Sequence, residues 1–397
     1  MYAAGAMAIV PLSELLGQPV ASAFLRGVVA RGRYSNAYLF HGPAGVGKTT
    51  AALAFARAIL CERTPKGPRE SAPGAAADEA CGRCAACHKS AGLKHPDLRF
   101  LFPVSGEERD LDETVAETLE EVRRDPLFVF RYEKAASIRL SLTRELLREL
   151  AYQPFEAAVR VVVVRDADRM REDQYSALLK TLEEPGSATV WVLTSSRPAR
   201  LPATIRSRCQ RVRFAPLAEG VVREFLEVRV GATPSEARLA TALAAGNLGR
   251  ALLLRDEEPR AERDEALRLL EPALRGDSPG LWRVAQQFMK YGKTGRERLR
   301  RMIELHELWL RDVLRIQAGA ATDALANRDR ESELRSQARG LGAREIRRRL
   351  MVLEEALRSI EGNVTPDLTL FSAMARMSGS GLGAGEWPAH PTARWDY

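Results

Sequence analysis

The sequence has no uninterrupted run of 18 apolar residues, so we expect no transmembrane helix. Its first ten residues, MYAAGAMAIV, have no basic segment before their short apolar run, which argues against a secretory signal. The five histidines show no spacing typical of a catalytic triad, and no paired carboxylates suggest acid–base catalysis. These absences favour a cytoplasmic protein and argue against a hydrolase that uses a catalytic triad or a pair of carboxylates.

Lysine is scarce, because only eight of the 60 basic residues are lysine, and the net charge is +8. This charge fits either a solvated basic surface or electrostatic affinity for a polyanion such as DNA. Hydrophobic residues make up 45% of the chain and charged residues 28%. A chain of 397 residues with this composition is typical of a globular protein of two or three domains.

Cysteine is also scarce, and four of the five cysteines fall in one region: Cys61, Cys81, Cys84 and Cys87. Without a secretory signal, metal binding is a better interpretation of this group than disulfide bonds. Four thiolates suit a closed, structural Zn²⁺ site, and the Gly/Pro-rich segment between the first two can close the loop. An iron–sulfur cluster, a substitute ligand from His88 or His95, and no metal at all remain alternatives.

Apolar strands alternate with helical segments in the first half of the chain. We expect strands at 37–41, 96–103, 159–164 and 189–194, and helices at 48–60, 143–154 and 172–183. Residues 105–136 look like an insertion with one charged helix. This alternation predicts an α/β domain with a parallel sheet.

The second half is rich in helical patterns. In REIRRRLMVLEEALRSIEGN, four apolar residues at helical spacing form one stripe: Ile346, Leu350, Leu353 and Leu357. We expect a P-loop domain at 1–214 with a zinc module at 61–87, a helical lid at 215–257 and an all-α domain at 258–377. The Gly/Pro-rich tail, 378–397, is expected to be disordered.

A glycine loop follows the first expected strand. Gly42-x4-Gly47-Lys48-Thr49 matches the Walker A pattern, in which loop N–H groups and a lysine hold phosphates and a hydroxyl ligates Mg²⁺. The strand before it and the helix after it are the context that this motif requires. We therefore expect ATP or ADP, with or without Mg²⁺, to contact the following residues: Gly42, Pro43, Gly45, Val46, Gly47, Lys48, Thr49 and Thr50.

Several segments together resemble one family. GQPVASAFLRGVVARGRYSNAYLFHGPAGVGKT, ALLKTLEEP, LPATIRSRCQRVRF and GNLGRAL occur in the order and spacing of the clamp-loader AAA+ subunits of bacterial DNA polymerase III. Within that family the delta-prime group is more similar than the gamma/tau motor ATPases. The resemblance covers residues 11–377, without the insertion at 105–136.

The resemblance implies a RecA-like α/β domain, a small helical lid and a helical collar that assembles a pentameric hetero-oligomer. It implies gamma/tau and delta subunits, the sliding clamp and primed DNA as partners, and no membrane association. Zinc on the four cysteines is also a feature of the family. The residue Arg208, in RSRC, matches an arginine finger that acts in trans on a neighbour's ATP; an ordinary surface ion pair is the alternative.

Two positions depart from the active members of the family. The strand exit VVVVRDADRM places Arg165 where they have the magnesium-binding aspartate, and a guanidinium cannot ligate Mg²⁺. Gly249 in GNLGRAL stands where they have the sensor-2 arginine. These departures favour a non-hydrolysing subunit over a motor ATPase, although Asp166 or Asp168 could serve the metal instead. Thr194, Ser195 and Ser196 are sensor-1 residues or ordinary strand-end caps.

Overall fold

A computed structural model gives the fold. It describes residues 10–65, 78–104, 110–125, 128–130, 136–183, 188–255, 261–268, 278–289, 292–361 and 365–378. The chain divides into two compact units, one of Met1–Val222 with Gly246–Leu253 and one of Arg223–Ala245 with Leu254–Tyr397. We describe each unit by itself.

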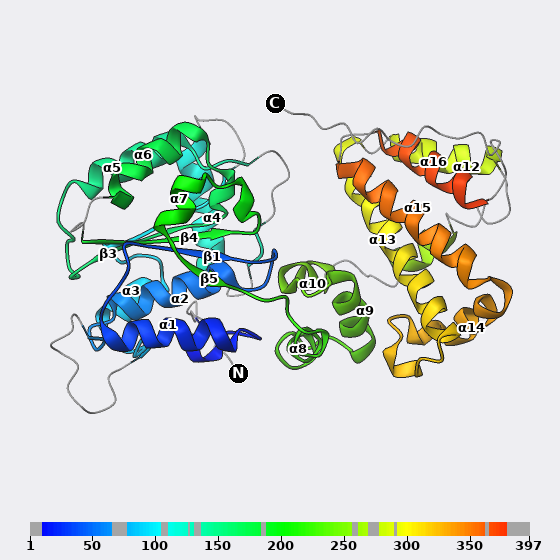
Figure 1. Cartoon of the computed structure of the whole chain (residues 1–397), viewed down its shortest axis with the longest axis horizontal. Coiled ribbons are helices and arrows are strands. Elements are labelled where there is room, and N and C mark those ends of the chain that lie inside the picture. Colours follow the sequence, from blue (N-terminus) through cyan, green and yellow to red (C-terminus); the bar gives the residue numbers. More distant parts are fainter. Residues whose placement is uncertain are drawn as a thin grey trace. The chain divides into compact units, whose positions relative to one another are not determined.

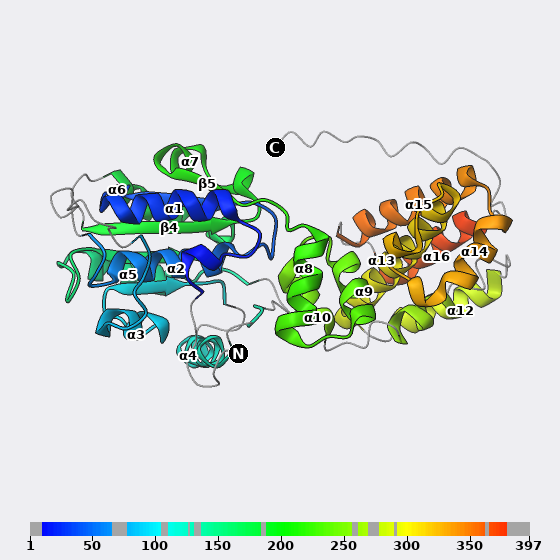
Figure 2. The ribbon, with the colours of Figure 1, turned by 90° about the horizontal axis from the view of Figure 1, so that it is seen from below.

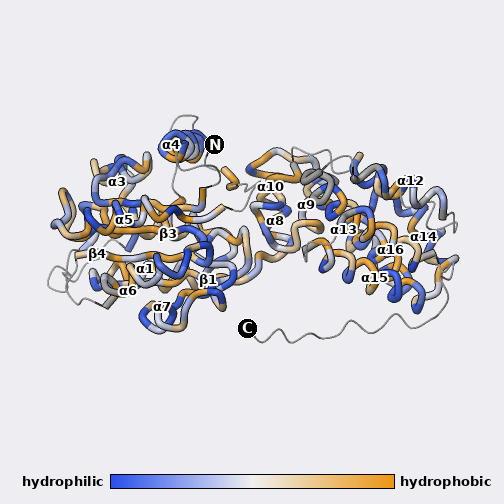
Figure 3. Tube along the Cα trace, turned by 90° about the horizontal axis from the view of Figure 1, so that it is seen from above, coloured by the Kyte–Doolittle hydropathy of each residue, from blue (hydrophilic) through white to orange (hydrophobic). Residues whose placement is uncertain are grey.

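The first unit is built on a five-stranded parallel sheet. Its strand order is β2-β3-β4-β1-β5, with β1 (Ala37–His41), β2 (Leu98–Leu101), β3 (Arg160–Val164), β4 (Thr189–Ser195) and β5 (Gln210–Arg213). Every residue of β3 and β4 is buried, which is typical of a parallel sheet covered on both faces. In Figure 3 the hydrophobic residues follow these strands.

Helices cover both faces of this sheet (Figure 1). On one face lie α1 (Pro19–Arg31), α2 (Lys48–Leu60) and α3 (Ala85–Ala91), and on the other α5 (Leu140–Leu150), α6 (Glu172–Glu183) and α7 (Ala203–Arg208). The second face packs through a continuous core that includes Leu146, Leu178, Trp191 and Ile205. Short 3-10 turns join these elements: η1 (Leu12–Glu14), η3 (Ala167–Arg169) and η4 (Pro198–Arg200).

The predicted α/β fold with a parallel sheet is confirmed, and most element boundaries agree within a few residues. The helix expected at 143–154 was placed wrongly at its end, because α5 stops at Leu150 and residues 151–154 form a turn and loop. Pro154 lacks the N–H that a continuing helix needs. The charged helix expected within the insertion is α4 (Leu111–Arg124), which is largely hydrophilic in Figure 3.

Parts of the expected loop and tail regions lie outside the described residues. They are 66–77 in the Gly/Pro-rich segment, 105–109, 126–127 and 131–135 in the insertion, and 379–397 in the tail.

The second unit is helical in its described residues. It begins with the end of α8 (Glu219–Phe225), the short π-helix η5 (Leu226–Val230), α9 (Pro234–Ala244) and the end of α10 (Leu248–Arg255). The elements that follow are a helix at 261–268, α12 (Ser278–Met289), α13 (Gly292–Gln317), the short turns η6 (Thr322–Ala324) and η7 (Arg328–Arg330), α14 (Glu331–Gly340), α15 (Ala343–Glu361) and α16 (Pro366–Ser378). The helices α13, α15 and α16 pack together (Figures 1 and 2).

The expected apolar stripe of α15 faces this helical core, because Ile346 and Leu353 are fully buried and Leu350 and Leu357 are half-buried. None of the described helices has the length and apolar character needed to cross a bilayer. The division into two units does not isolate a lid of residues 215–257, so the three-part organisation remains a prediction.

Candidate functional site

The glycine loop lies between β1 and α2, as expected, and its backbone depends on glycine. Gly42 and Gly45 have φ angles of +148° and +67°. A Cβ on Gly42 would lie 2.2 Å from the Phe214 carbonyl oxygen, and one on Gly45 would lie 1.6 Å from Oδ1 of Asn247. Both positions therefore combine a left-handed backbone with a close approach of neighbouring atoms.

Lys48 begins α2 and is only 6% exposed. Its ammonium group donates hydrogen bonds to the carbonyl oxygens of Gly42, at 2.8 Å, and Pro43. Burial lowers the pKa of Lys48 to about 8, opposed by Asp166 and reinforced by Arg165. A phosphate anion beside Lys48 would favour its charged form, which suits a lysine whose role is to hold phosphate.

Gln18 connects the loop to the segment that follows β5, the last strand of the sheet. Its side-chain amide donates to the carbonyl oxygens of Val46 and Ala215, at 3.4 and 2.8 Å, and accepts from the Ala215 N–H at 3.0 Å. Gln18 is buried, so these bonds are shielded from water and fix the far side of the loop.

Arg165 leaves β3 beside this loop. Its Nη1 atom donates to Oγ1 of Thr49 at 2.9 Å, and its Nε lies 3.3 Å from a carboxylate oxygen of Asp166. Its Cζ lies 4.1 Å from the ring centroid of Phe130, a distance typical of a cation–π contact. The sequence alone placed Arg165 at the end of this strand. The structure adds that its guanidinium is hydrogen-bonded to the Walker A hydroxyl of Thr49.

These residues do not fit Mg²⁺. A Walker A hydroxyl offers a lone pair to the metal, but the Thr49 oxygen here accepts from a guanidinium. Two unit charges 4 Å apart repel by roughly 4 kcal/mol at an effective dielectric constant of 20, and a divalent ion doubles that figure. Arg165 offers no acceptor in compensation.

The two aspartates after Arg165 have other partners. Asp166, with φ +47°, turns back toward Arg165, and its N–H donates to Oγ1 of Thr194 at 3.0 Å. Asp168 accepts from Oγ of Ser195 at 2.8 Å and from Nε of Arg197 at 2.9 Å. The polar end of β4 therefore supports the loop after β3, and these contacts oppose the alternative in which either aspartate serves a metal.

The segment GNLGRAL approaches the loop from α10. The Leu248 N–H donates to the Gly45 carbonyl at 3.0 Å, and Asn247 caps the helix by accepting from the Arg250 N–H at 2.9 Å. A Cβ on Gly249 would lie 3.5 Å from Val129 and 3.8 Å from the Gly45 Cα. The position expected for a sensor-2 arginine is thus a glycine packed against the loop and the insertion.

The four predicted cysteine ligands come together. The Sγ atoms of Cys61 and Cys84 lie 3.9 Å apart, those of Cys81 and Cys87 4.0 Å apart, and all four lie within 4.8 Å of one another. A tetrahedral Zn²⁺ with ligands at about 2.3 Å has sulfur–sulfur edges of about 3.8 Å. The cluster can therefore hold a metal ion, and neither His88 nor His95 is part of it.

Two helix ends position this cluster. Cys61 follows the last residue of α2, and Cys84 caps α3 by accepting from the Cys87 N–H at 3.4 Å. Glu62 accepts from the Ala86 N–H at 3.2 Å and ties the two ends together. A hydrogen bond with Cys87 lowers the pKa of Cys61, and the same bond raises the pKa of Cys87, so these two thiols share a proton when no metal is bound.

Arg208 is exposed at the end of α7. The buried side chains of Ile205 and Cys209 anchor this short helix to the core, while Nη1 of Arg208 donates to the Thr204 carbonyl at 2.9 Å. Arg206, two residues earlier, is half-buried. The two arginines of this short helix therefore differ in exposure.

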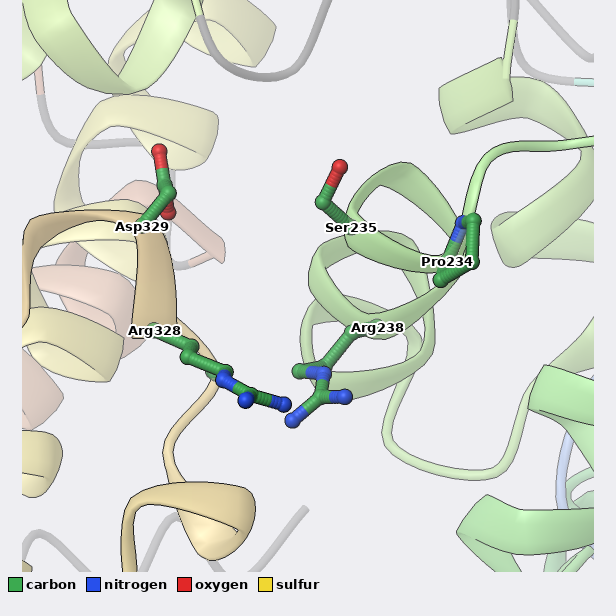
Figure 4. Close-up of a pocket in the computed structure, with 6 residues that line it drawn as sticks. Pro234, Ser235, Arg238, Arg328 and Asp329 are labelled. Atoms are coloured by element: carbon green, nitrogen blue, oxygen red, sulfur yellow. The ribbon is translucent and has the colours of Figure 1, made fainter.

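Three features of this region were missed in the sequence. Phe130 and Arg197 reach the loop or its supports from segments that no local motif marks, and Asn247, although it lies within GNLGRAL, was not expected to approach Gly45. A cavity of about 300 Å³ in the second unit was also missed (Figure 4). It is lined by Pro234, Ser235, Arg238, Ala326, Arg328 and Asp329.

The two arginines of that cavity already have protein partners. Arg238 donates to the Asp323 carbonyl oxygen at 3.2 Å, and Arg328 pairs with the Asp323 carboxylate at 2.8 Å. The cavity therefore gives no indication of chemistry comparable to that of the glycine loop.

Strand, glycine loop, helix and parallel sheet together define a P-loop domain of the AAA+ class. A family model described as DNA polymerase III, delta subunit, matches residues 17–218, which is 202 of 397 residues. The chain therefore belongs to the DNA polymerase III delta subunit family.

Individual relatives agree with this assignment. The delta-prime subunit of DNA polymerase III from Bacillus subtilis is 27% identical over 350 residues, which cover 87% of this chain and 92% of that protein. The tau subunit from the same organism is 27% identical over 201 residues, covering 51% of this chain but 28% of that protein. The predicted resemblance to a delta-prime-like clamp-loader subunit is confirmed.

Among solved structures, a gamma-subunit-related protein of DNA polymerase III from Thermotoga maritima aligns with a TM-score of 0.42 and 16% identity. The alignment covers 90% of this chain and 98% of that one.

Proposed function

We propose that this chain is the non-hydrolysing, delta-prime-type member of a clamp loader and that it supplies Arg208 to the ATP site of a neighbouring subunit. In this role it assembles with gamma/tau and delta subunits in the cytoplasm and helps to load a sliding clamp on primed DNA. The observation that carries the non-hydrolysing half of the proposal is the guanidinium of Arg165 on the Thr49 hydroxyl.

Arg208 supports the other half. Its helix is anchored by buried Ile205 and Cys209, so the exposed guanidinium is presented from a fixed base. A planar guanidinium binds phosphate oxygens in a bidentate manner, and well-measured arginine fingers raise the rate by roughly 10³–10⁵. The net charge of +8 agrees with a partner that is a polyanion.

The test is reconstitution of the clamp loader with Arg208→Ala. We expect the ATP site next to this subunit to lose its activity, so the total rates of ATP hydrolysis and clamp loading fall. The fold, metal content and nucleotide affinity of the variant chain itself should be unchanged. A complex that hydrolyses ATP and loads clamps at the unmodified rate would contradict the proposal.

Two further variants separate geometry from charge. Arg208→Lys keeps the positive charge but loses the planar fork, so it should be as defective as Arg208→Ala in hydrolysis while still assembling. Arg144→Ala removes another exposed positive charge, from α5, and should leave both rates unchanged.

For the cysteine cluster we propose Zn²⁺ in a structural site. The sulfur separations fit tetrahedral coordination, and four protein ligands leave no position for substrate. When bound, the metal would join the end of α2 to the start of α3, which are otherwise connected by a long segment.

The alternative is a gamma/tau-type motor ATPase. The similarity to a tau subunit over 201 residues favours it, whereas Arg165 and Gly249 oppose it. Sustained hydrolysis of ATP by the purified chain separates the two functions.

A further inference from the structure

The position of Arg165 is fixed from several sides. Its backbone N–H donates to the Leu101 carbonyl at 2.8 Å, which continues the pairing of β2 with β3. Its side chain contacts the Thr49 hydroxyl, the Asp166 carboxylate and the Phe130 ring. A side chain held in this way places its charge beside the glycine loop at little further entropic cost.

The guanidinium of Arg165 occupies the position beside the loop hydroxyl in which a metal ion would be coordinated. Thr49 is the residue whose hydroxyl ligates Mg²⁺ in a Walker A motif, and this hydroxyl is hydrogen-bonded to Arg165. A guanidinium and a magnesium ion both neutralise phosphate oxygens, but the guanidinium is permanently charged and belongs to the chain.

We propose that this loop binds the phosphate groups of a nucleoside di- or triphosphate as the metal-free anion, with Arg165 in place of Mg²⁺. Phosphate oxygens would be held by three groups of the chain: the loop N–H groups at the start of α2, the ammonium of Lys48 and the guanidinium of Arg165. No chemical step is part of this binding, so the nucleotide remains intact.

The proposal explains why a complete Walker A loop accompanies a strand exit that cannot bind magnesium. Gly42 and Gly45 keep the phosphate-binding backbone, since any side chain there would collide with Phe214 or Asn247. Buried Lys48 gains from a nearby anion, because its present partners in the loop are neutral carbonyl groups.

The experiment is a titration of the full-length chain with a fluorescent ADP analogue, followed by anisotropy, once in EDTA and once in MgCl₂, with the metal content of the cysteine cluster shown by elemental analysis to be the same in both. We expect the Kd in EDTA to be within about twofold of the Kd in MgCl₂, because the cation of the site is part of the protein. Unlabelled ADP, ATP and inorganic phosphate serve as competitors. Competition by ADP or ATP at lower concentration than inorganic phosphate identifies the site as one for nucleotides.

The variant Arg165→Asp should make nucleotide binding depend on Mg²⁺. This variant should bind at least about tenfold more weakly than the unmodified chain in EDTA, a change of about 1.4 kcal/mol. It should then recover affinity in MgCl₂, because Asp is a magnesium ligand. Lys48→Ala should lose binding under both conditions. Arg171→Asp makes the same charge change at an exposed position and should match the unmodified chain.

Two results would overturn the proposal: no binding in EDTA, or binding by the unmodified chain that tightens tenfold or more with Mg²⁺. Circular dichroism of each variant distinguishes a folded chain that has lost the site from an unfolded one. Neither result bears on Arg208, whose role is measured in the reconstituted complex, so the inference and the proposed function can fail separately.

Discussion

The guanidinium of Arg165 donates a 2.9 Å hydrogen bond to the hydroxyl of Thr49, which lies 116 positions earlier in the chain. This contact predicts that the purified chain does not turn over ATP. Hydrolysis of a bound nucleotide needs Mg²⁺ to bridge the β- and γ-phosphates, and the residue that would hold the metal shell is a cation. A coupled phosphate-release assay with excess ATP should show no more than background.

Restoring one residue is not expected to restore hydrolysis. Arg165→Asp recovers a magnesium ligand, but Gly249 still leaves the site without the sensor-2 arginine of active relatives. The double variant Arg165→Asp/Gly249→Arg is the appropriate gain-of-function trial. Multiple turnovers by the unmodified chain that disappear in Lys48→Ala would show that the motor-ATPase alternative is correct.

The cysteine cluster predicts one equivalent of Zn²⁺ per chain, measured by elemental analysis of protein purified without chelator. Cys84→Ser removes one thiolate, so we expect loss of the metal and local loosening between α2 and α3, with the sheet intact. Cys209→Ser is the matched control, because this cysteine lies outside the cluster and should leave the zinc content unchanged. Iron with visible absorbance, or no metal, would refute the assignment.

The sequence predicts those parts of the site that are encoded locally. The Walker A residues Gly42 to Thr49 are contiguous, so the strand, loop and helix follow from one motif. Cys81, Cys84 and Cys87 lie within seven residues of one another, so they are also encoded locally. The fourth ligand, Cys61, joins them because the end of α2 lies beside this segment. The parallel sheet follows from apolar strands that alternate with helices.

Contacts between distant segments could not be predicted in this way. The insertion places the ring of Phe130 against Arg165. Asn247, the residue before α10, lies so close to Gly45 that a Cβ there would be 1.6 Å from its Oδ1 atom. Phe130 belongs to no motif and Asn247 lies within GNLGRAL, but each contact depends on how a long intervening segment folds. The end of α5 was misplaced for a related reason: the helical pattern continues to residue 154, but Asp97, the residue before β2, binds the backbone N–H groups of the three residues that follow, which lie outside any helix.

Asp97 is the basis of a stability prediction. Its buried carboxylate accepts from the backbone N–H groups of Phe155, Glu156 and Ala157, at 2.6, 2.7 and 2.8 Å. Asp97→Asn replaces one acceptor oxygen with a donor, which leaves at least one of these N–H groups unpaired. We expect a loss of about 1–3 kcal/mol in the free energy of unfolding, measured by urea denaturation.

The matched control for this change is Glu117→Gln, which converts an exposed acid on α4 to its amide. It should alter stability by less than about 0.5 kcal/mol. Equal effects of the two variants would mean that the three hydrogen bonds to Asp97 contribute no more than a surface charge.

His306 predicts a pH dependence in the second unit. This α13 residue is 2% exposed, and neither ring nitrogen has a hydrogen-bond partner among the described residues. Burial, with a smaller contribution from Arg349, lowers its pKa from 6.5 to about 4. The unfolded chain therefore binds a proton at His306 below pH 6.5, whereas the folded chain binds it only below about pH 4. The contribution of His306 to the free energy of unfolding is fully present above pH 6.5 and decreases as the pH falls from 6.5 to about 4.

The loss should reach about 3 kcal/mol at pH 4, since each unit of pKa difference corresponds to about 1.4 kcal/mol. Two variants test its origin through thermal melts between pH 4 and pH 8. His306→Leu removes both the titration and the buried ring nitrogens, so it should flatten this part of the profile and raise stability at pH 5. His306→Gln also removes the titration but buries an amide in a site without hydrogen-bond partners, so it should flatten the profile while lowering stability at pH 8. If the slope between pH 6.5 and pH 4 survives in both variants, the acid sensitivity comes from other groups.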